Sequence, residues 1–302
     1  MSEIEAINDP IFIGGDGRSG TTLLNVILDS HPALSVAPEY HFNGGSDLGA
    51  TALQAVRIKQ SGGLLEGGIR AVDTPEWKPS IQFVNRVVRA GLTLEEIHDS
   101  IQLAMEETGT NLVEFGDRRK LIEKFGIILA NRNSKKRWGM KIMREIRNPK
   151  RYAEVWNAAQ FIHIIRDGRD VASSQLMGHG SWGYGDVEEA AKNWCNIIIQ
   201  SRKNTSGLSY AEIKYEDIVT NPESSLRMIC KFLGIRWSKK LLMHEKQKHD
   251  FFETKIAHPS REASKQEINN SAVGRYKRDL SEEQIDIFNS IAGEMLHSLG
   301  YE

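Results

Sequence analysis

The feature that most constrains the fold is a strand, a glycine-rich turn and a helix in the segment PIFIGGDGRSGTTLLNVILDSHP, residues 10–32. Residues 11–14 are apolar and predict a buried strand, and residues 20–29 carry apolar side chains at helical spacing. The turn has the spacing G-x-x-x-x-G of a phosphate-binding loop, in which backbone N–H groups at a helix N-terminus bind an anion. Thr21 stands where such loops carry a lysine, and Arg18 stands three positions earlier.

A phosphate loop without its lysine has less positive charge to set against the terminal phosphates of a nucleotide. A sulfuryl ester carries less negative charge than a terminal phosphoryl group, so a ligand with such a group fits the loop. Arg18 can offer its planar fork of donors to that anion. The alternative is a turn that only connects a strand to a helix. The flanking strand, Arg18 and the pair Thr21 and Thr22 favour a ligand site.

Strands alternate with helices along most of the chain. Further strands are predicted at residues 138–143, 161–165 and 210–214, and helices at 93–107, 117–130, 149–157, 170–176, 186–203, 222–233 and 281–299. This alternation predicts an α/β, P-loop-like fold of three layers, in which a central parallel sheet is flanked by helices. Residues 1–302 are expected to form a single domain, with residues 44–135 as a helical insertion that covers the ligand cleft.

Charge and composition argue against several classes of function. The net charge of -1 over 302 residues gives no field that favours nucleic acid or an anionic membrane. No window approaches about 18 consecutive apolar residues, so no membrane span is predicted. Residues 1–10 have no basic flank and no apolar run, which argues against a secretory signal and favours a cytoplasmic protein. Cys195 and Cys230 fit no metal or disulfide framework and are interpreted as buried thiols.

A second candidate site lies in FIHIIRDGRDVASS, residues 161–174. The strand ends on Arg166, and the helix that follows the turn carries Ser174. Ligands of open α/β sheets bind at the carboxyl ends of the strands, so both side chains could hold one anion. The alternative is a strand, turn and helix whose arginine–aspartate pairs are only surface ion pairs, which contribute little.

Together these segments resemble the family of sulfotransferases that use 3′-phosphoadenosine 5′-phosphosulfate (PAPS). In that family RSGTT is a common form of the 5′-phosphosulfate loop. The family's 3′-phosphate site is an arginine after a strand and a serine eight residues later, the spacing of Arg166 and Ser174. Further matches are YEDIV at residues 215–219, NP at 221–222, FLGI at 232–235 and VGRYK at 273–277, the last resembling a GRW-type element with Tyr in place of Trp.

Within the family, the chain most resembles the protein-tyrosine sulfotransferases and their bacterial relatives. In that subgroup the loop helix leads through His-Pro, here residues 31–32, to a glutamate that acts as general base. Glu39 stands 21 residues after Arg18, as the subgroup's spacing requires. The segment WGMK at residues 138–141 resembles a WGxK segment whose lysine faces the transferring group, which corresponds to Lys141.

The resemblance implies in-line transfer of a sulfuryl group from PAPS to an acceptor hydroxyl, with PAP as product and without a metal ion. Glu39 would accept the proton of the hydroxyl, and Arg18 and Lys141 would stabilise charge on the transferring group. The residues expected to bind PAPS are Arg18, Ser19, Gly20, Thr21, Thr22, Arg166, Ser174, Tyr215 and Arg275. The insertion of residues 44–135 would shape the acceptor pocket.

Several points stay open at the level of sequence. His31, His41 and His179 are alternative bases. The acceptor could be a small molecule, a carbohydrate or a peptidyl tyrosine, and the oligomeric state is undetermined. A P-loop-type nucleotide kinase, which would bind ATP with magnesium, and a non-catalytic protein that binds PAPS or PAP are the two other classes of function.

Two further segments have candidate roles at the acceptor side. The basic residues Arg144, Arg147, Lys150 and Arg151 are interpreted as a solvated helix face that could also meet an acidic acceptor. Trp182 and Tyr184 lie in a glycine-rich loop and could line the acceptor pocket.

Overall fold

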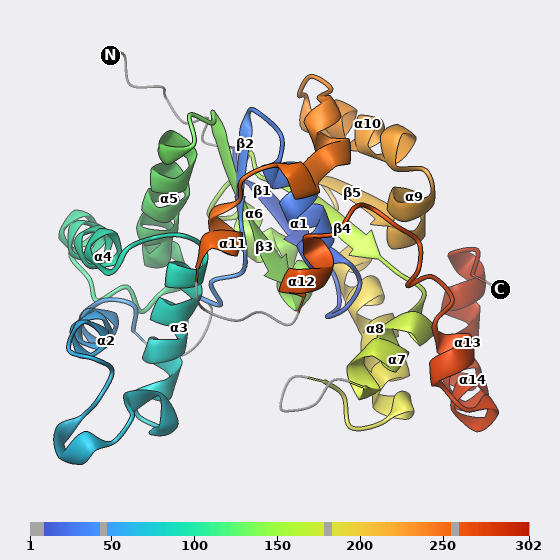
Figure 1. Ribbon diagram of the computed structural model, residues 1–302, viewed down its shortest axis with the longest axis horizontal. Coiled ribbons are helices and arrows are strands. Elements are labelled where there is room, and N and C mark those ends of the chain that lie inside the picture. Colours follow the sequence, from blue (N-terminus) through green and yellow to red (C-terminus); the bar gives the residue numbers. More distant parts are fainter. Residues whose placement is uncertain (1–8, 43–46, 178–182, 255–259, 302) are drawn as a thin grey trace.

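The computed structural model describes residues 9–42, 47–177, 183–254 and 260–301. At its centre is a sheet of five parallel strands in the order β2-β3-β1-β4-β5 (Figure 1). The strands are β1 (Ile11–Gly14), β2 (Leu34–Ala37), β3 (Arg137–Met143), β4 (Gln160–Ile165) and β5 (Ser209–Lys214). The predicted α/β architecture with a central parallel sheet flanked by helices is confirmed.

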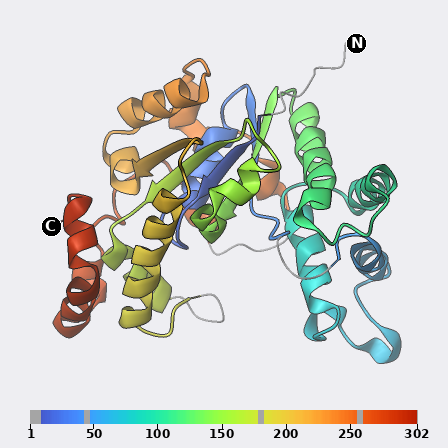
Figure 2. The same ribbon diagram turned by 180° about the vertical axis from the view of Figure 1, so that it is seen from behind.

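Helices pack on both faces of the sheet, as Figures 1 and 2 show from opposite sides. Between β1 and β2 runs α1 (Thr21–Asp29), and after β3 follow α6 (Pro149–Ala153), α7 (Gly168–Leu176), α8 (Val187–Lys203), α9 (Tyr215–Thr220), α10 (Pro222–Leu233), α11 (Asp250–Glu253), α12 (Arg261–Ser264), α13 (Tyr276–Asp279) and α14 (Glu282–Ser298). None of the described helices is long and apolar enough to cross a bilayer.

The central strand β1 shows why both faces are covered. Its four residues are all buried, as expected for a parallel strand between two layers of helices. Ile11 and Ile13 belong to one apolar cluster, together with Leu24 of α1. Phe12 points to the opposite face, where its ring packs edge-on against Trp138 of β3 at a centroid distance of 6.1 Å.

The pairing of β1 with β3 contains one irregularity. Ile13 lies opposite Lys141, but Gly14 lies opposite Met143, so β3 has one extra residue at the end that faces the phosphate loop. Met143 has a φ of 51°, which is uncommon for a residue other than glycine. Lys141 itself lies in the regular part of this pairing, directly before the irregularity.

The insertion between β2 and β3 is helical. It holds α2 (Ala50–Gln60), α3 (Lys78–Arg89), α4 (Leu94–Thr108) and α5 (Phe115–Arg132). One apolar cluster runs without a break from Phe12 and Trp138 of the sheet to Phe83 and Phe125 of these helices. A Cβ atom on Gly126 would lie 2.5 Å from the Trp138 ring, so the absence of a side chain there allows α5 to lie directly against β3.

Several elements were missed or predicted with the wrong bounds. The strand β2 was not predicted, because its four residues begin only two positions after Pro32 and are too few to show a period. The helix predicted at residues 149–157 ends at Ala153, after which Trp156 turns into the aromatic cluster around Phe12. In the insertion, α2 and α3 were missed, whereas α4 and α5 lie within two residues of their predicted bounds.

The two cysteines are free thiols. Cys230 is buried, as predicted, and Cys195 is partly exposed. Burial raises the pKa of both thiols.

Candidate active site

The loop between β1 and α1 presents a helix N-terminus without a side-chain cap. Gly20, the N-cap residue, has a φ of 94° and has no side chain to accept the N–H groups of the first turn. A Cβ atom at this position would lie 2.5 Å from Cδ2 of Tyr215. Glycine is therefore required twice, for the left-handed backbone and for the close approach of the tyrosine. The N–H groups of α1 remain available to an anion, and Tyr215 lies directly beside them.

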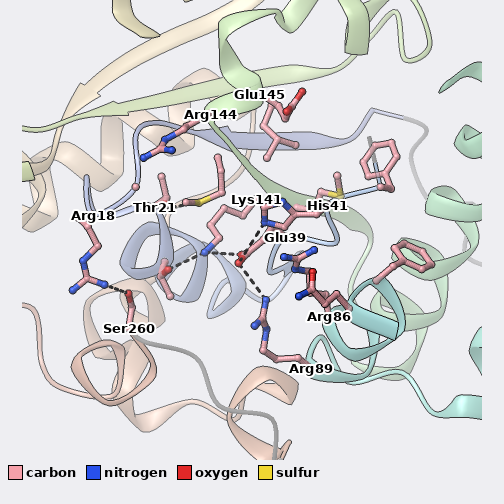
Figure 3. A pocket seen from close by; sticks show the side chains of 18 of the residues that line it. Arg18, Thr21, Glu39, His41, Arg86, Arg89, Lys141, Arg144, Glu145 and Ser260 are labelled. Atoms are coloured by element: carbon pink, nitrogen blue, oxygen red, sulfur yellow. Dashed lines mark hydrogen bonds and ion pairs between the residues drawn. The ribbon is translucent and has the colours of Figure 1, made fainter. Parts of the chain in front are cut away.

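Arg18 joins the two sequence motifs. Its Nε donates a hydrogen bond to Oγ of Ser174 at 2.9 Å. Its Nη1 donates to Oγ of Ser260 at 2.9 Å, as Figure 3 shows. Arg18 has a φ of 73°, a strained conformation that costs about 1–2 kcal/mol for a residue with a side chain. Ser260, at the start of α12, was not singled out from the sequence because it lies 242 positions from Arg18 in a polar stretch without regular pattern.

Three arginines gather around the loop. Burial, and then the positive charges of Arg166 and Arg275, lower the pKa of Arg18. Arg166 also donates to the backbone oxygen of Arg18 at 3.1 Å, and its guanidinium lies 4.7 Å from the centre of the Tyr215 ring. Like charges that are held together in a half-buried place are favourable to a bound anion. The predicted PAPS-binding residues of the two motifs therefore share one site.

The C-terminal motif is tied to this site by a carboxylate. Asp170 forms an ion pair with Arg166 at 3.2 Å and accepts the N–H groups of Gly274 at 2.8 Å and of Tyr276 at 3.0 Å. Arg275 itself forms an ion pair with Asp279 at 2.7 Å. Asp170 thus holds the segment that carries Arg275 against the strand that ends in Arg166.

A lysine reaches the phosphate loop from a neighbouring strand. The Nζ of Lys141 on β3 donates to Oγ1 of Thr22 on α1 at 2.9 Å, and it forms an ion pair with Oε2 of Glu39 at 2.7 Å (Figure 3). The lysine side chain is only 1% exposed. Burial lowers the pKa of Lys141, and the carboxylate of Glu39 opposes that shift. The loop that lacks its own lysine therefore has a buried cation at the first turn of its helix.

The predicted base, Glu39, lies two residues after β2 and faces this lysine. Its other oxygen, Oε1, is 3.2 Å from Nη2 of Arg89 on α3. The Glu39 side chain is 11% exposed. Arg89 was missed in the sequence because α3 was not predicted, although Arg86 and Arg89 have the i, i+3 spacing of one helix face.

The alternative histidine bases lie in different places. His41 is the neighbour of Glu39, with Nε2 4.0 Å from Oε1, and burial together with the charge of Arg86 lowers the pKa of His41 to about 4. Both ring nitrogens of His31 are engaged elsewhere, Nε2 with the backbone oxygen of Arg236 at 2.7 Å and Nδ1 with the N–H of Ala33 at 3.1 Å. His179, like Trp182, lies outside the described residues.

A cavity of about 950 Å³ opens between the phosphate loop and the insertion. Lys141, Glu39 and Thr22 line its inner end. Apolar walls come from Phe42, Leu48, Phe83, Met140, Ile142 and Tyr152. The arginines Arg86, Arg89, Arg144 and Arg147 also line the cavity. Of these, Arg86 has no hydrogen bond or ion pair with any other described residue, and burial lowers its pKa.

The basic residues after β3 are not all on a solvated helix face. Nε of Arg144 is 2.7 Å from Oδ1 of the buried Asp16 in the phosphate loop, and its guanidinium lies 4.4 Å from the centre of the Tyr184 ring. The hydroxyl of Tyr184 donates to the same Asp16 oxygen at 3.2 Å. Burial raises the pKa of Asp16, and Arg144 opposes the shift. Tyr184 lines the cavity, as its sequence context suggested.

Comparison with known proteins agrees with this arrangement. Protein-tyrosine sulfotransferase A of Caenorhabditis elegans is 25% identical over 298 residues, which cover 97% of this chain and 67% of that protein. Protein-tyrosine sulfotransferase 1 of Danio rerio is 24% identical over 242 residues, which cover 78% of this chain and 56% of that protein. The chain thus spans about half to two thirds of the length of these curated relatives.

Solved structures share the fold. The sulfotransferase domain of the Synechococcus PCC 7002 olefin synthase aligns with a TM-score of 0.59 and 20% identity, over 94% of this chain and 95% of that one. The sulfotransferase domain of the curacin biosynthetic pathway aligns with a TM-score of 0.59 and 18% identity, over 97% and 98%.

A sequence profile described as "Sulfotransferase family" matches residues 10–239. That span begins at the strand before the phosphate loop and takes in Glu39, Lys141 and Arg166. The match covers about three quarters of the sequence, so the chain belongs to the sulfotransferase family.

Proposed function

We propose that this chain transfers a sulfuryl group from PAPS to a hydroxyl group of an acceptor. The observation that carries the proposal is the position of Lys141, which lies between Thr22 of the phosphate loop and the carboxylate of Glu39. Sulfuryl transfer to a hydroxyl requires a base that takes the proton of the hydroxyl and a cation that stabilises charge on the sulfuryl group. Glu39 and Lys141 lie close enough together to serve one reacting group in these two ways. The family membership and the cavity that opens at this point support the same conclusion.

The residues around the loop suit a ligand with two separate anionic groups. The N–H groups at the start of α1 suit the 5′-phosphosulfate, because a helix N-terminus is an anion site. Arg166 and Ser174, with Arg275 near them, suit the 3′-phosphate. Arg18 lies between the two sets, since it bonds Ser174 and is followed directly by the loop turn. Neutralisation of three mutually repelling arginines would add to the affinity for such a ligand.

In the proposed step, an oxygen of the acceptor attacks the sulfur in line with the bridging oxygen of PAPS. The new O–S bond forms while the S–O bond to the 5′-phosphate breaks, and the bond electrons leave with PAP. The acceptor proton moves to the Glu39 carboxylate. Lys141 and Arg18 stabilise the charge that develops on the sulfuryl and bridging oxygens. Each product keeps its full complement of electrons, and no oxidant or reductant takes part.

The walls of the cavity support an acceptor with an apolar or aromatic body and a negative charge. The apolar residues Phe42, Phe83 and Ile142 suit a flat ring, and Arg86 offers a guanidinium that forms no hydrogen bond or ion pair within the described part of the chain. Glu39 suits an oxygen nucleophile. Among the open acceptors, a tyrosyl side chain in an acidic peptide meets these requirements, and the curated relatives are protein-tyrosine sulfotransferases.

The donor assignment predicts thermal stabilisation by PAP. At a PAP concentration a hundred times the dissociation constant, the free energy of unfolding should rise by about 2.7 kcal/mol. For a chain of this size, that should raise the melting temperature by about 4 °C. The measurement is a melting curve with PAP, run beside one with ATP and magnesium. A shift with ATP and magnesium alone would overturn the assignment in favour of a kinase.

Replacement of Arg86 by Gln is expected to raise KM for an acidic tyrosyl peptide about tenfold and to leave the dissociation constant of PAP unchanged. The reason is that a charge-assisted contact to a ligand carboxylate contributes about 1.5–3 kcal/mol. The same variant should have little effect on a neutral phenol, which is the matched control substrate. An equal KM change for both acceptors would show that Arg86 acts on the shape of the pocket instead.

If the wild-type protein turns over no acceptor in a set of phenols, sugars and peptides, it would be a PAP-binding protein without transferase activity.

A further inference from the structure

Arg89 lies at the C-terminal end of α3 and contacts Glu39 from the insertion. Its Nη2 is 3.2 Å from Oε1 of Glu39, and both side chains are 11% exposed. Among the described residues this is the one ion pair that Arg89 makes, and its Nε is buried without a hydrogen-bond partner. A buried guanidinium is unfavourable unless a counter-charge compensates it. At this position that compensation comes from Glu39.

The carboxylate of Glu39 lies between cations from two different elements. Lys141 of β3 holds Oε2 on the side of the phosphate loop, and Arg89 of α3 holds Oε1 on the side of the insertion (Figure 3). His41 lies 4.0 Å from Oε1, and the charge of Arg86 also acts on Glu39. Of these four groups, Arg89 alone contacts the oxygen that faces away from Lys141 at hydrogen-bonding distance.

We propose that Arg89 is a positioning residue for the base, and this inference rests on the proposed function. When Lys141 turns towards a sulfuryl group, it gives up Oε2, which then becomes the oxygen that accepts the proton. Arg89 keeps the carboxylate in place through Oε1 during this change, so Glu39 does not follow the lysine. Its charge also keeps the carboxylate ionised while Lys141 is engaged elsewhere.

A consequence concerns the insertion. The same helix, α3, carries Phe83 and Arg86 on the cavity wall and Arg89 on the base. One helix therefore contributes to the cavity wall that faces the sulfuryl acceptor and also holds the base Glu39. Phe83 and Arg89 are only six residues apart on this helix. A shift of α3 would move the acceptor and the base together.

The direct test is the pH titration of the Glu39 carboxyl group, followed by NMR in protein labelled with carbon-13 at the glutamate side-chain carboxyl and saturated with PAP. The Glu39 signal is assigned as the one absent from Glu39→Gln. In Arg89→Met the titration midpoint should move to higher pH by about 1 unit or more, because loss of a nearby cation makes a carboxylate easier to protonate. In Arg89→Lys, which restores the charge, the midpoint should return towards that of the wild type.

Arg132→Met is the matched control. Arg132 also belongs to the insertion and forms an ion pair, with Glu96 at 2.6 Å, but that pair lies outside the cavity. It should leave the Glu39 midpoint unchanged. If Arg89→Met does not fold, Arg89→Gln takes the same test, because it removes the charge and retains polar N–H donors. A Glu39 midpoint that is the same in wild type and in the uncharged Arg89 variant would overturn the proposal.

A kinetic measurement separates this inference from the proposed function. With radiolabelled PAPS and an acidic tyrosyl peptide, Arg89→Met should lower kcat at neutral pH about tenfold, move the acid limb of the kcat profile to higher pH and leave PAP affinity unchanged. A wild-type protein that transfers no sulfuryl group refutes the proposed function, while the titration still decides whether Arg89 controls the ionisation of Glu39. A wild-type protein that is active, with an Arg89→Met profile of the same shape, refutes the role of Arg89 alone.

Discussion

Glu39→Gln is expected to lower turnover about 10²- to 10⁴-fold, the range that general-base catalysis contributes. The amide has nearly the shape of the carboxylate but cannot accept the acceptor's proton. Binding of PAP should change little, because Glu39 is not among the proposed PAPS-binding residues and contacts the phosphate-loop side of the site through Lys141. The measurement is the initial rate of transfer from radiolabelled PAPS, with PAP affinity determined by calorimetry. The acid limb of the wild-type pH profile should also be lost in the variant.

Glu223→Gln is the matched control, since Glu223 is half exposed and pairs with Arg227 on the surface of α10. It should behave as the wild type in both measurements. Unchanged turnover in Glu39→Gln would exclude Glu39 as the base. Attention would then pass to His41, which lies 4.0 Å from Glu39 and lines the cavity.

Arg18→Ala should weaken PAP binding roughly 10- to 100-fold, because a hydrogen bond to a charged group contributes about 1.5–3 kcal/mol. The loss should extend to kcat, since the same guanidinium stands next to the position of the sulfuryl group in the proposed complex. Arg18→Lys should fall between the wild type and the alanine variant, as it keeps the charge but loses the planar fork of donors. Calorimetry with PAP measures the affinity, and transfer from labelled PAPS measures kcat.

Arg227→Ala removes an exposed arginine of α10 and should leave PAP affinity unchanged, so it controls for the general effect of lost positive charge. Wild-type affinity in Arg18→Ala would mean that the phosphate loop does not hold the nucleotide through this residue. The site formed by Arg18, Arg166 and Arg275 would then be expected to bind an anion other than PAP.

Local patterns in the sequence were sufficient for the parts of the site that lie next to regular elements. The strand Ile11–Gly14 was predicted with its observed bounds, and Arg166 and Ser174 lie where a strand end and the following helix were expected. These predictions succeeded because a buried strand, a glycine turn and a helix N-terminus each leave a signature within a few residues. The hydrogen bond from Arg18 to Ser174, which joins the two motifs, was not predicted.

Other parts of the site depend on contacts that no local pattern records. Arg89 is 50 residues from Glu39, and its helix was not predicted although Ile81, Val84 and Val87 recur at helical spacing. Ser260 reaches Arg18 from a polar stretch near the C-terminus. Arg144 was read as solvated because charged residues usually are, but the buried Asp16 draws it into the phosphate loop. In each case the partner is determined by tertiary packing.

The origin of the buried lysine has a consequence for how this site can vary. In a loop of the G-x-x-x-x-G-K type the lysine and the backbone N–H donors belong to one turn. Their relative position therefore does not depend on how the strands of the sheet are paired. In this chain the cation comes from β3, and its position depends on the register in which Lys141 pairs with Ile13. A slip of one residue would turn the lysine to the opposite face of the sheet. Insertions or deletions in the strands, far from any ligand, would therefore act on the chemistry of the site as directly as a substitution in the loop.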